Sequence, residues 1–170
     1  RKSLTVYEGM VGIAENAFIN VKGTSYTITA MVEVPPANAN GVIIAQAGRF
    51  GGWVLYMKNG KLQHEYNYFG LERTTIASAK PVSPGTHTFQ YEFLYDGGPP
   101  GSGGTGKLSI DGQNVGEGKI AKTQPFFYSA DEGVDVGMDG ETAVSNDYKE
   151  GNNKFTGKIQ QVKVEVPPGK

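Results

Sequence analysis

Apolar and polar residues alternate along several stretches of the chain, with a period of two. This period, in stretches rich in β-branched and aromatic residues, predicts β-strands. The stretches are 27–34, 41–47, 86–95 and 155–166. The second is apolar on both faces, which indicates a strand buried on both sides. The last keeps one apolar face only if a slip or bulge lies near Gln160-Gln161.

Asn59-Gly60 predicts a two-residue hairpin turn, because both residues accept the positive φ angles that a tight turn needs. The turn sets a strand register that opposes Lys58 to Lys61, Met57 to Leu62, Leu55 to His64, and Trp53 to Tyr66. One face then collects the large, mostly apolar side chains of Trp53, Leu55, Met57, Leu62, His64 and Tyr66. The other face holds Val54, Tyr56, Gln63, Glu65 and Asn67. We expect the first face in the core and the second in solvent.

Asp111-Gly112 predicts a second hairpin, over 106–118. The stretch 96–106 is rich in Gly, Pro and Ser, and is expected to form a flexible surface loop. No stretch of about 10 residues or more has the signals of a capped helix, although a short turn fits near 11–17. Strands at regular spacing with turns between them predict an all-β sandwich of two antiparallel sheets, forming one domain over 1–170.

The composition of the chain argues against several classes of function. The chain has 170 residues and a net charge of -1, and we see no basic stripe of the kind that nucleic-acid binders carry. No apolar run is long enough to cross a membrane. The absence of cysteine removes thiol catalysis, disulfides and cysteine-based zinc sites, but does not fix the compartment. The chain begins at Arg1 without Met, so we expect a piece of a longer protein.

Two histidines and one glycine-rich segment are candidates for chemistry. His64, opposite Leu55, is interpreted as a structural core residue. His87 has no Asp or Ser at a diagnostic spacing and is interpreted as structural too. The segment 48–52 lacks the spacing of a phosphate-binding loop and no helix follows it. Its Arg49 is expected to pair with Glu65, Glu72 or an acidic loop, or else to face a ligand.

The order of several segments resembles the C-terminal region of a group of bacterial arylsulfatases, from roughly Ala14 to Val166. The segments are A-Q-A-G-R-F-G-G-W, Y-N-Y-F-G-L-E-R, Y-E-F-L-Y-D-G-G, L-S-I-D-G-Q-N-V, D-E-G-V-D-V-G-M-D and F-T-G-K-I-Q-Q-V. The resemblance implies a laminin-G-like or concanavalin A-like jelly roll, which agrees with the predicted strands.

The resemblance does not carry the sulfatase activity. Sulfatases use a formylglycine made within a C/S-x-P-x-R signature, and this chain contains no such signature. We therefore expect a non-catalytic accessory domain of a sulfuric ester hydrolase. Its partner would be a sulfatase catalytic domain outside this chain, expected N-terminal to it. Its role would be to pack on that domain and shape substrate access.

The acidic segment 129–141 is a candidate calcium site, because Ca²⁺ prefers carboxylate and carbonyl oxygens. The candidate ligands are Asp131, Asp135 and Asp139, and laminin-G-like domains often carry Ca²⁺ at a sheet rim. The segment does not satisfy the EF-hand spacing. The alternative is a polar loop in which Asp135 accepts bonds from turn amides.

An autonomous lectin-like module is the alternative function. Aromatic rings stack on sugar faces, while amides and guanidinium groups bind hydroxyls or sulfate. The residues expected to face a carbohydrate, a sulfated glycan or a partner domain are Arg49, Tyr56, Asn67, Tyr68 and Phe69. An independent glycosidase is a further alternative, although the compact E-x-D-x-x-E strand motif of related jelly-roll glycosidases is absent.

Overall fold

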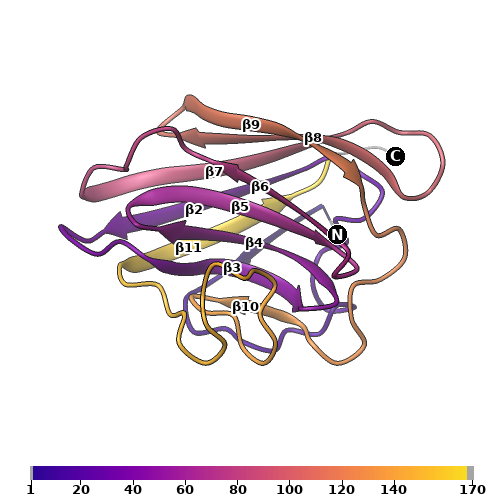
Figure 1. Cartoon of the computed structure of the whole chain (residues 1–170), viewed down its shortest axis with the longest axis horizontal. Helices are drawn as coiled ribbons and strands as arrows, with labels where there is room; N and C mark the ends of the chain where they lie inside the picture. The colour runs from indigo at the N-terminus through magenta and orange to yellow at the C-terminus, as the bar shows by residue number, and fades with distance from the viewer. Residues whose placement is uncertain (1, 168–170) are drawn as a thin grey trace.

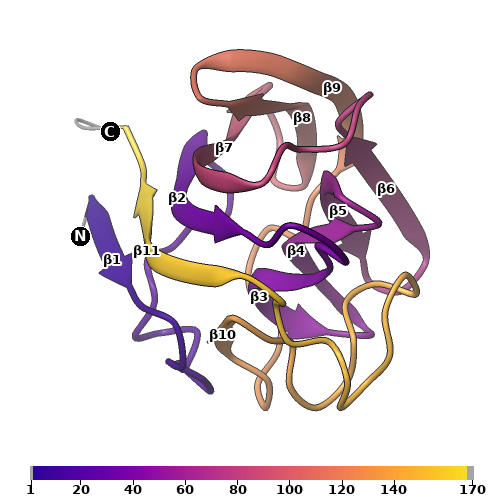
Figure 2. The same ribbon diagram turned by 90° about the vertical axis from the view of Figure 1, so that its left-hand side faces the viewer.

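A computed structural model describes residues 2–167, and its regular elements are β-strands in two antiparallel sheets. The first sheet has the order β1 (Ser3–Val6), β11 (Lys158–Glu165), β2 (Tyr26–Val34), β7 (Gly85–Tyr95), β8 (Ser102–Ile110) and β9 (Gln113–Lys122). The second has the order β10 (Val134–Val136), β3 (Gly41–Gly48), β4 (Gly51–Lys58), β5 (Lys61–Tyr68) and β6 (Glu72–Ala77). Figures 1 and 2 show the sheets as two facing layers.

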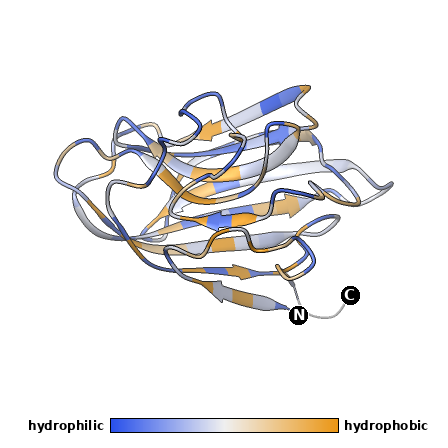
Figure 3. Cartoon of the chain, turned by 90° about the horizontal axis from the view of Figure 1, so that it is seen from below, coloured by the Kyte–Doolittle hydropathy of each residue, from blue (hydrophilic) through white to orange (hydrophobic). Residues whose placement is uncertain are grey.

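The core lies between the sheets and is built by the alternation that the sequence shows. Inward-facing residues such as Ile28, Trp53 and Tyr91 are fully buried. Figure 3 shows hydrophobic and hydrophilic positions following one another along the strands. The predicted β4–β5 register is confirmed in full, with Trp53 opposite Tyr66 and Lys58 opposite Lys61. The predicted slip in the last strand is also confirmed, between Ile159 and Gln161. Among the described residues no helix is long and apolar enough to span a membrane.

The predicted surface loop 96–106 is wrong in its second half. β8 begins at Ser102 and pairs with β7 on one side and β9 on the other. A Cβ on Gly103 would lie 2.0 Å from the carbonyl oxygen of Ile120, so glycine permits the strands to approach here. The β8 glycines of this stretch, Gly103, Gly104 and Gly106, therefore allow close packing of the sheet.

The prediction that the second face of β4 and β5 is solvated is also wrong. The segment 137–157 crosses the outer side of the second sheet (Figure 2). It forms a small second core in which Val144 and Tyr148 pack on Val42, Val54 and Tyr56. Because this segment lacks a strand period, its role as a cover could not be read from the sequence.

Candidate functional site

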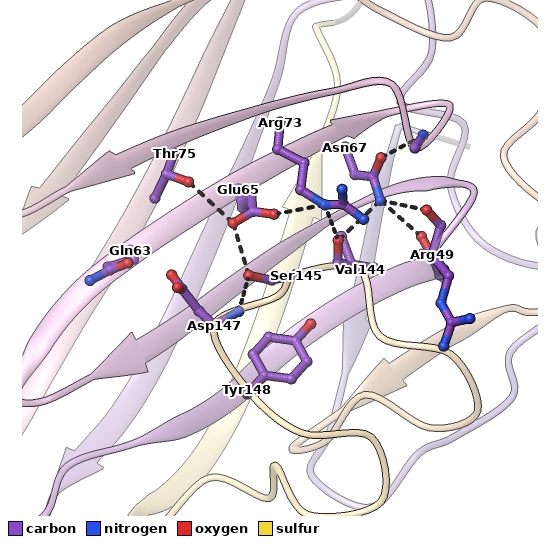
Figure 4. Close-up of polar contacts among 12 residues, drawn as sticks. Arg49, Gln63, Glu65, Asn67, Arg73, Thr75, Val144, Ser145, Asp147 and Tyr148 are labelled. Atoms are coloured by element: carbon purple, nitrogen blue, oxygen red, sulfur yellow. Dashed lines mark hydrogen bonds and ion pairs between the residues drawn. The ribbon is translucent and has the colours of Figure 1, made fainter.

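Asn67 is a buried anchor for the covering segment 137–157. Its amide nitrogen donates hydrogen bonds to the carbonyl oxygens of Gly48, Arg49 and Val144 at 3.3, 2.9 and 3.0 Å (Figure 4). Its side-chain oxygen accepts the Gly70 N–H at 2.8 Å. The amide is thus committed to the protein's own backbone. The expectation that Asn67 faces a ligand is corrected by this burial.

Tyr56 is covered in the same way. The ring is only 1 % exposed and packs edge-on against Tyr148. Its hydroxyl lies 2.5 Å from Asp147 Oδ2 and 2.9 Å from Gln63 Oε1. Burial, followed by the bond to Asp147, raises the pKa of Tyr56 well above its usual value. Tyr56 therefore belongs to the scaffold beneath the segment 137–157 and not to an open surface.

The other three residues expected to face a ligand or partner lie at one end of the sandwich. Arg49 is exposed but forms an ion pair with Glu150, and not with Glu65 or Glu72. Tyr68 is half-buried, and Lys122 lies over its ring at 5.9 Å. Phe69 is 44 % exposed at the β5–β6 turn. Of these three, Phe69 presents an open apolar surface.

The three aspartates of the candidate calcium site have different environments. Asp135 accepts backbone N–H groups from Gly12 and Gly140, both at 2.7 Å, as its alternative role requires. Asp139 is buried and accepts bonds from the Val144 N–H and the Tyr148 hydroxyl. Over residues 2–167, no three acidic, histidine or cysteine side chains gather as a metal cluster.

Calcium binding at Asp131, Asp135 and Asp139 stays a prediction, and it has a direct test. A metal that binds only the native state raises the unfolding temperature. If the site exists, millimolar Ca²⁺ raises the melting temperature and EDTA reverses the rise. The variant Asp131→Asn, which removes the most exposed of the three carboxylates, would then lose the response. An identical melting temperature in Ca²⁺ and EDTA contradicts the prediction.

A groove of about 720 Å³ lies at the end of the sandwich, between two loops. One wall comes from the β1–β2 connection and includes Asn16 and Asn20, and the other comes from the β9–β10 connection and includes Phe126 and Phe127. The two phenylalanines are 76 % and 62 % exposed. The volume falls within the range of small-ligand sites.

Glu15 joins the two walls of this groove. Its carboxylate accepts the backbone N–H groups of Tyr128 and Ser129 at 2.8 and 3.2 Å. It also pairs with Lys22 at 2.7 Å, and Lys22 lies 5.1 Å from the centre of the Tyr128 ring. The groove is therefore held by a charged group from one loop that binds the backbone of the other.

The groove exposes polar side-chain groups beside its two phenylalanine rings. The Asn16 amide and the Asp131 carboxylate make no hydrogen bond or ion pair with any residue in 2–167. Among residues 2–167, the side-chain oxygen of Asn20 accepts only the Lys22 N–H, at 3.0 Å. Exposed rings beside free amide and carboxylate groups can hold a ligand that is apolar on one face and carries hydroxyls at its edge.

Phe126 and Phe127 are not predicted as site residues from the sequence, because aromatic residues in a sandwich are usually part of the core. A signal was nevertheless present. Pro125 is followed by Phe126, Phe127 and Tyr128, and adjacent side chains in an extended segment point to opposite sides. All three rings could not face the core together, and the structure buries only Tyr128.

A second cavity, of about 460 Å³, contains Ser83, His87 and Asp111. His87 Nδ1 lies 2.6 Å from Asp111 Oδ2, and Nε2 lies 3.2 Å from Ser83 Oγ. This arrangement of side chains resembles a Ser-His-Asp triad. However, Nε2 is also 2.7 Å from the carbonyl oxygen of Ser83, so both ring nitrogens face acceptors. The shorter Nε2 contact is therefore with the backbone of Ser83 and not with its hydroxyl, and the contacts join the β6–β7 connection to the β8–β9 turn.

No model of a known protein family matches the chain, and no curated protein is significantly similar to it in sequence. Solved structures do share its fold. The mouse laminin α1 chain domains LG4-5 superpose with a TM-score of 0.56 at 15 % identity, covering 97 % of this chain and 39 % of that one. A carbohydrate-binding module, the CBM40 of the Ruminococcus gnavus IT-sialidase bound to α2,6-sialyllactose, gives 0.57 at 15 %, covering 97 % and 90 %.

A third similar structure is the NanB sialidase of Streptococcus pneumoniae, with a TM-score of 0.64 at 9 % identity over 95 % of this chain. This chain spans only 26 % of NanB, and 39 % of the laminin structure. At sequence identities of 15 % or less, the similarity to these structures shows a shared fold alone. The chain therefore adopts the jelly-roll β-sandwich that is found in laminin G domains and in carbohydrate-binding modules.

Proposed function

We propose that this chain is a non-catalytic carbohydrate-binding module that binds glycans in the groove between Asn16 and Phe126–Phe127. The observation that carries the proposal is the exposure of two adjacent phenylalanine rings beside polar groups without protein partners. Sugar rings have an apolar face that stacks on aromatic rings and hydroxyls that bind amides and carboxylates. The similar fold of a module solved with sialyllactose supports the proposal.

The proposal is tested by a glycan array followed by calorimetry with the glycans that bind. The variants Phe126→Ala and Phe127→Ala should each weaken binding at least about tenfold, since stacked aromatic rings carry much of the energy at binding surfaces. Both side chains are mostly exposed, so the melting temperature should change little.

Phe50→Ala is the matched control, because Phe50 is 71 % exposed but does not line the groove. It should leave glycan binding unchanged. An equal loss of glycan affinity in the Phe50 variant would show that the glycan binds outside the groove. No binding to any glycan at millimolar concentration would contradict the proposal.

A second candidate function is the accessory domain of an arylsulfatase, packing on its catalytic domain. The sequence resemblance motivates it, and packing on another domain would require an exposed apolar surface. Five large apolar side chains are exposed on connections at one end of the sandwich: Phe50, Phe69, Leu71, Phe126 and Phe127. The three connections meet at Gln124, which accepts the Phe69 N–H at 3.1 Å and closely approaches Gly51. Exposed apolar patches often mark docking surfaces.

This second function predicts a C/S-x-P-x-R signature in the sequence encoded beside this chain. With the adjoining region present, Leu71→Arg should weaken packing and lower the melting temperature of the longer protein, because it places a charge in a dry interface. The absence of the signature would contradict this candidate without affecting the glycan proposal.

A further inference from the structure

The charges of the groove determine which glycans it can accept, and this inference rests on the proposed glycan binding. The charged residues that line it are Glu15, Lys22, Asp131 and Glu132. Three carboxylates and one ammonium group give a net charge of -2. Within the described lining there is no arginine or histidine that could pair with an anionic ligand.

Lys22, the single cation in the described lining of the groove, is already neutralised. Lys22 Nζ lies 2.7 Å from Glu15, and the Lys22 side chain is only 7 % exposed. It also packs over the Tyr128 ring, which holds it in place. Arg49 on the β3–β4 turn pairs with Glu150, and Lys122 at the end of β9 lies over Tyr68.

The carboxylates are less fully compensated. Glu132 accepts the N–H and the hydroxyl of Thr142, both at 2.7 Å, but no cation pairs with it among the described residues. Asp131 is exposed and makes no side-chain contact of this kind in residues 2–167. An anionic sugar entering the groove would meet two uncompensated negative charges.

We infer that the groove selects uncharged glycans and rejects sialylated and sulfated ones. Like charges brought together in a partly dry site disfavour binding, and specificity often comes from such repulsion. Neutral sugar hydroxyls, in contrast, can donate hydrogen bonds to Asp131 and to the Asn16 amide oxygen. The chain would thus differ in ligand class from the module solved with α2,6-sialyllactose, although the two share a fold.

The test is an array of matched glycans, each neutral oligosaccharide printed beside its sialylated and sulfated forms, with affinities for lactose and α2,6-sialyllactose measured by calorimetry. We expect the neutral forms to bind at least about tenfold more tightly than their anionic forms at low salt. The difference should shrink as salt rises from about 0.05 to 0.5 M, because salt screens the repulsion.

Variants separate this inference from the function on which it rests. Asp131→Asn should reduce the preference for neutral glycans, and Asp131→Lys should reduce it further or reverse it. Glu117→Gln makes the same change in net charge at an exposed position on β9, and should leave the preference unchanged. Tighter or equal binding of anionic glycans by the unaltered chain would overturn the inference but keep the glycan-binding proposal. Failure of every glycan to bind would overturn both.

Discussion

His64 is a histidine whose charge state is fixed by burial alone. It is fully buried, and its ring stacks on Tyr91 with centroids 3.5 Å apart. Neither ring nitrogen has a hydrogen-bond partner among the described residues. Burial without a compensating bond disfavours the charged ring and lowers the pKa of His64 from 6.5 to about 3.

The low pKa of His64 predicts a loss of stability in acid. Below pH 6.5 the unfolded chain binds a proton that the folded chain does not bind until about pH 3. The contribution of neutral His64 to the free energy of unfolding is therefore complete above pH 6.5. It declines by about 1.4 kcal/mol per pH unit as the pH falls toward 3. His64→Leu, which is close in volume, should remove this slope from urea-unfolding curves measured between pH 7 and 4. His87→Gln is the control, and an unchanged slope in the His64 variant would contradict the assignment.

Asp139 shows the opposite dependence on pH. Burial raises the pKa of its carboxyl to about 7, although bonds from Tyr148 and Val144 act to lower it. Between pH 3.8 and 7 the folded chain holds a proton that the unfolded chain has released. The stability from this carboxyl is thus complete below pH 3.8 and is lost as the pH rises through 7.

Asp139→Asn should remove that loss while keeping an oxygen to accept both bonds. The free energy of unfolding of the variant, relative to the unaltered chain, should increase from pH 4 to 8 by on the order of 1 kcal/mol per unit across the titration. Urea unfolding at several pH values measures this. Asp131→Asn, at an exposed position, should show no such trend. A constant difference across the range would mean that Asp139 titrates normally.

At the scale of elements, the strands follow from the sequence because each buries one face and the turn residues fix their register. Asn59 adopts a φ of 50° and Gly60 one of 80°, as the predicted hairpin requires. The cover over the second sheet could not be predicted, since its contacts join residues such as Asn67 and Val144 that no local pattern relates. The triad-like contacts of His87 with Asp111 arise in the same way, from strand pairing between distant segments. Sequence patterns therefore predicted the sandwich but not the groove on its rim.

The glycine-rich start of β8 leads to a prediction for this element. A Cβ at Gly103 would meet backbone oxygens of Ile120 at 2.0 Å and Ala121 at 2.5 Å, and a strand paired on both sides cannot move away. Gly103→Ala should destabilise the chain by about 2–4 kcal/mol. Gly118→Ala on the paired strand is the control, because its Cβ would meet the Ile76 side chain at 3.1 Å. Gly118→Ala should lower the free energy of unfolding by less than about 1 kcal/mol. Similar losses of stability in both variants would show that backbone crowding at Gly103 is not what destabilises the chain.

At the scale of the whole molecule, the N-terminal segment joins the two sheets. β1 extends the first sheet by pairing with β11, with Val6 opposite Val162. The residues that follow cover the edge of β10 in the second sheet, where Ile13 and Val134 exchange backbone bonds at 3.0 and 2.8 Å. Between them, Glu8 accepts the Ile159 N–H at 2.7 Å. The same connection then supplies one wall of the groove, so the shape of the groove depends on this junction.

Since each sheet buries its apolar face only on the other, damage at the junction should weaken both sheets together. Val6→Ala removes buried methyl groups, and Glu8→Ala leaves the Ile159 N–H without its partner. Each should lower the free energy of unfolding by about 1–3 kcal/mol. Fluorescence of Trp53 on β4 reports its packing against Tyr26 of the first sheet, far-UV circular dichroism reports all strands, and the two transitions should shift by the same amount. Ser3→Ala, at an exposed position of β1, should shift neither. If the Trp53 transition stayed in place while the dichroism transition moved, strands would unfold separately from the core between the sheets, and the junction would not be what makes the sandwich one cooperative unit.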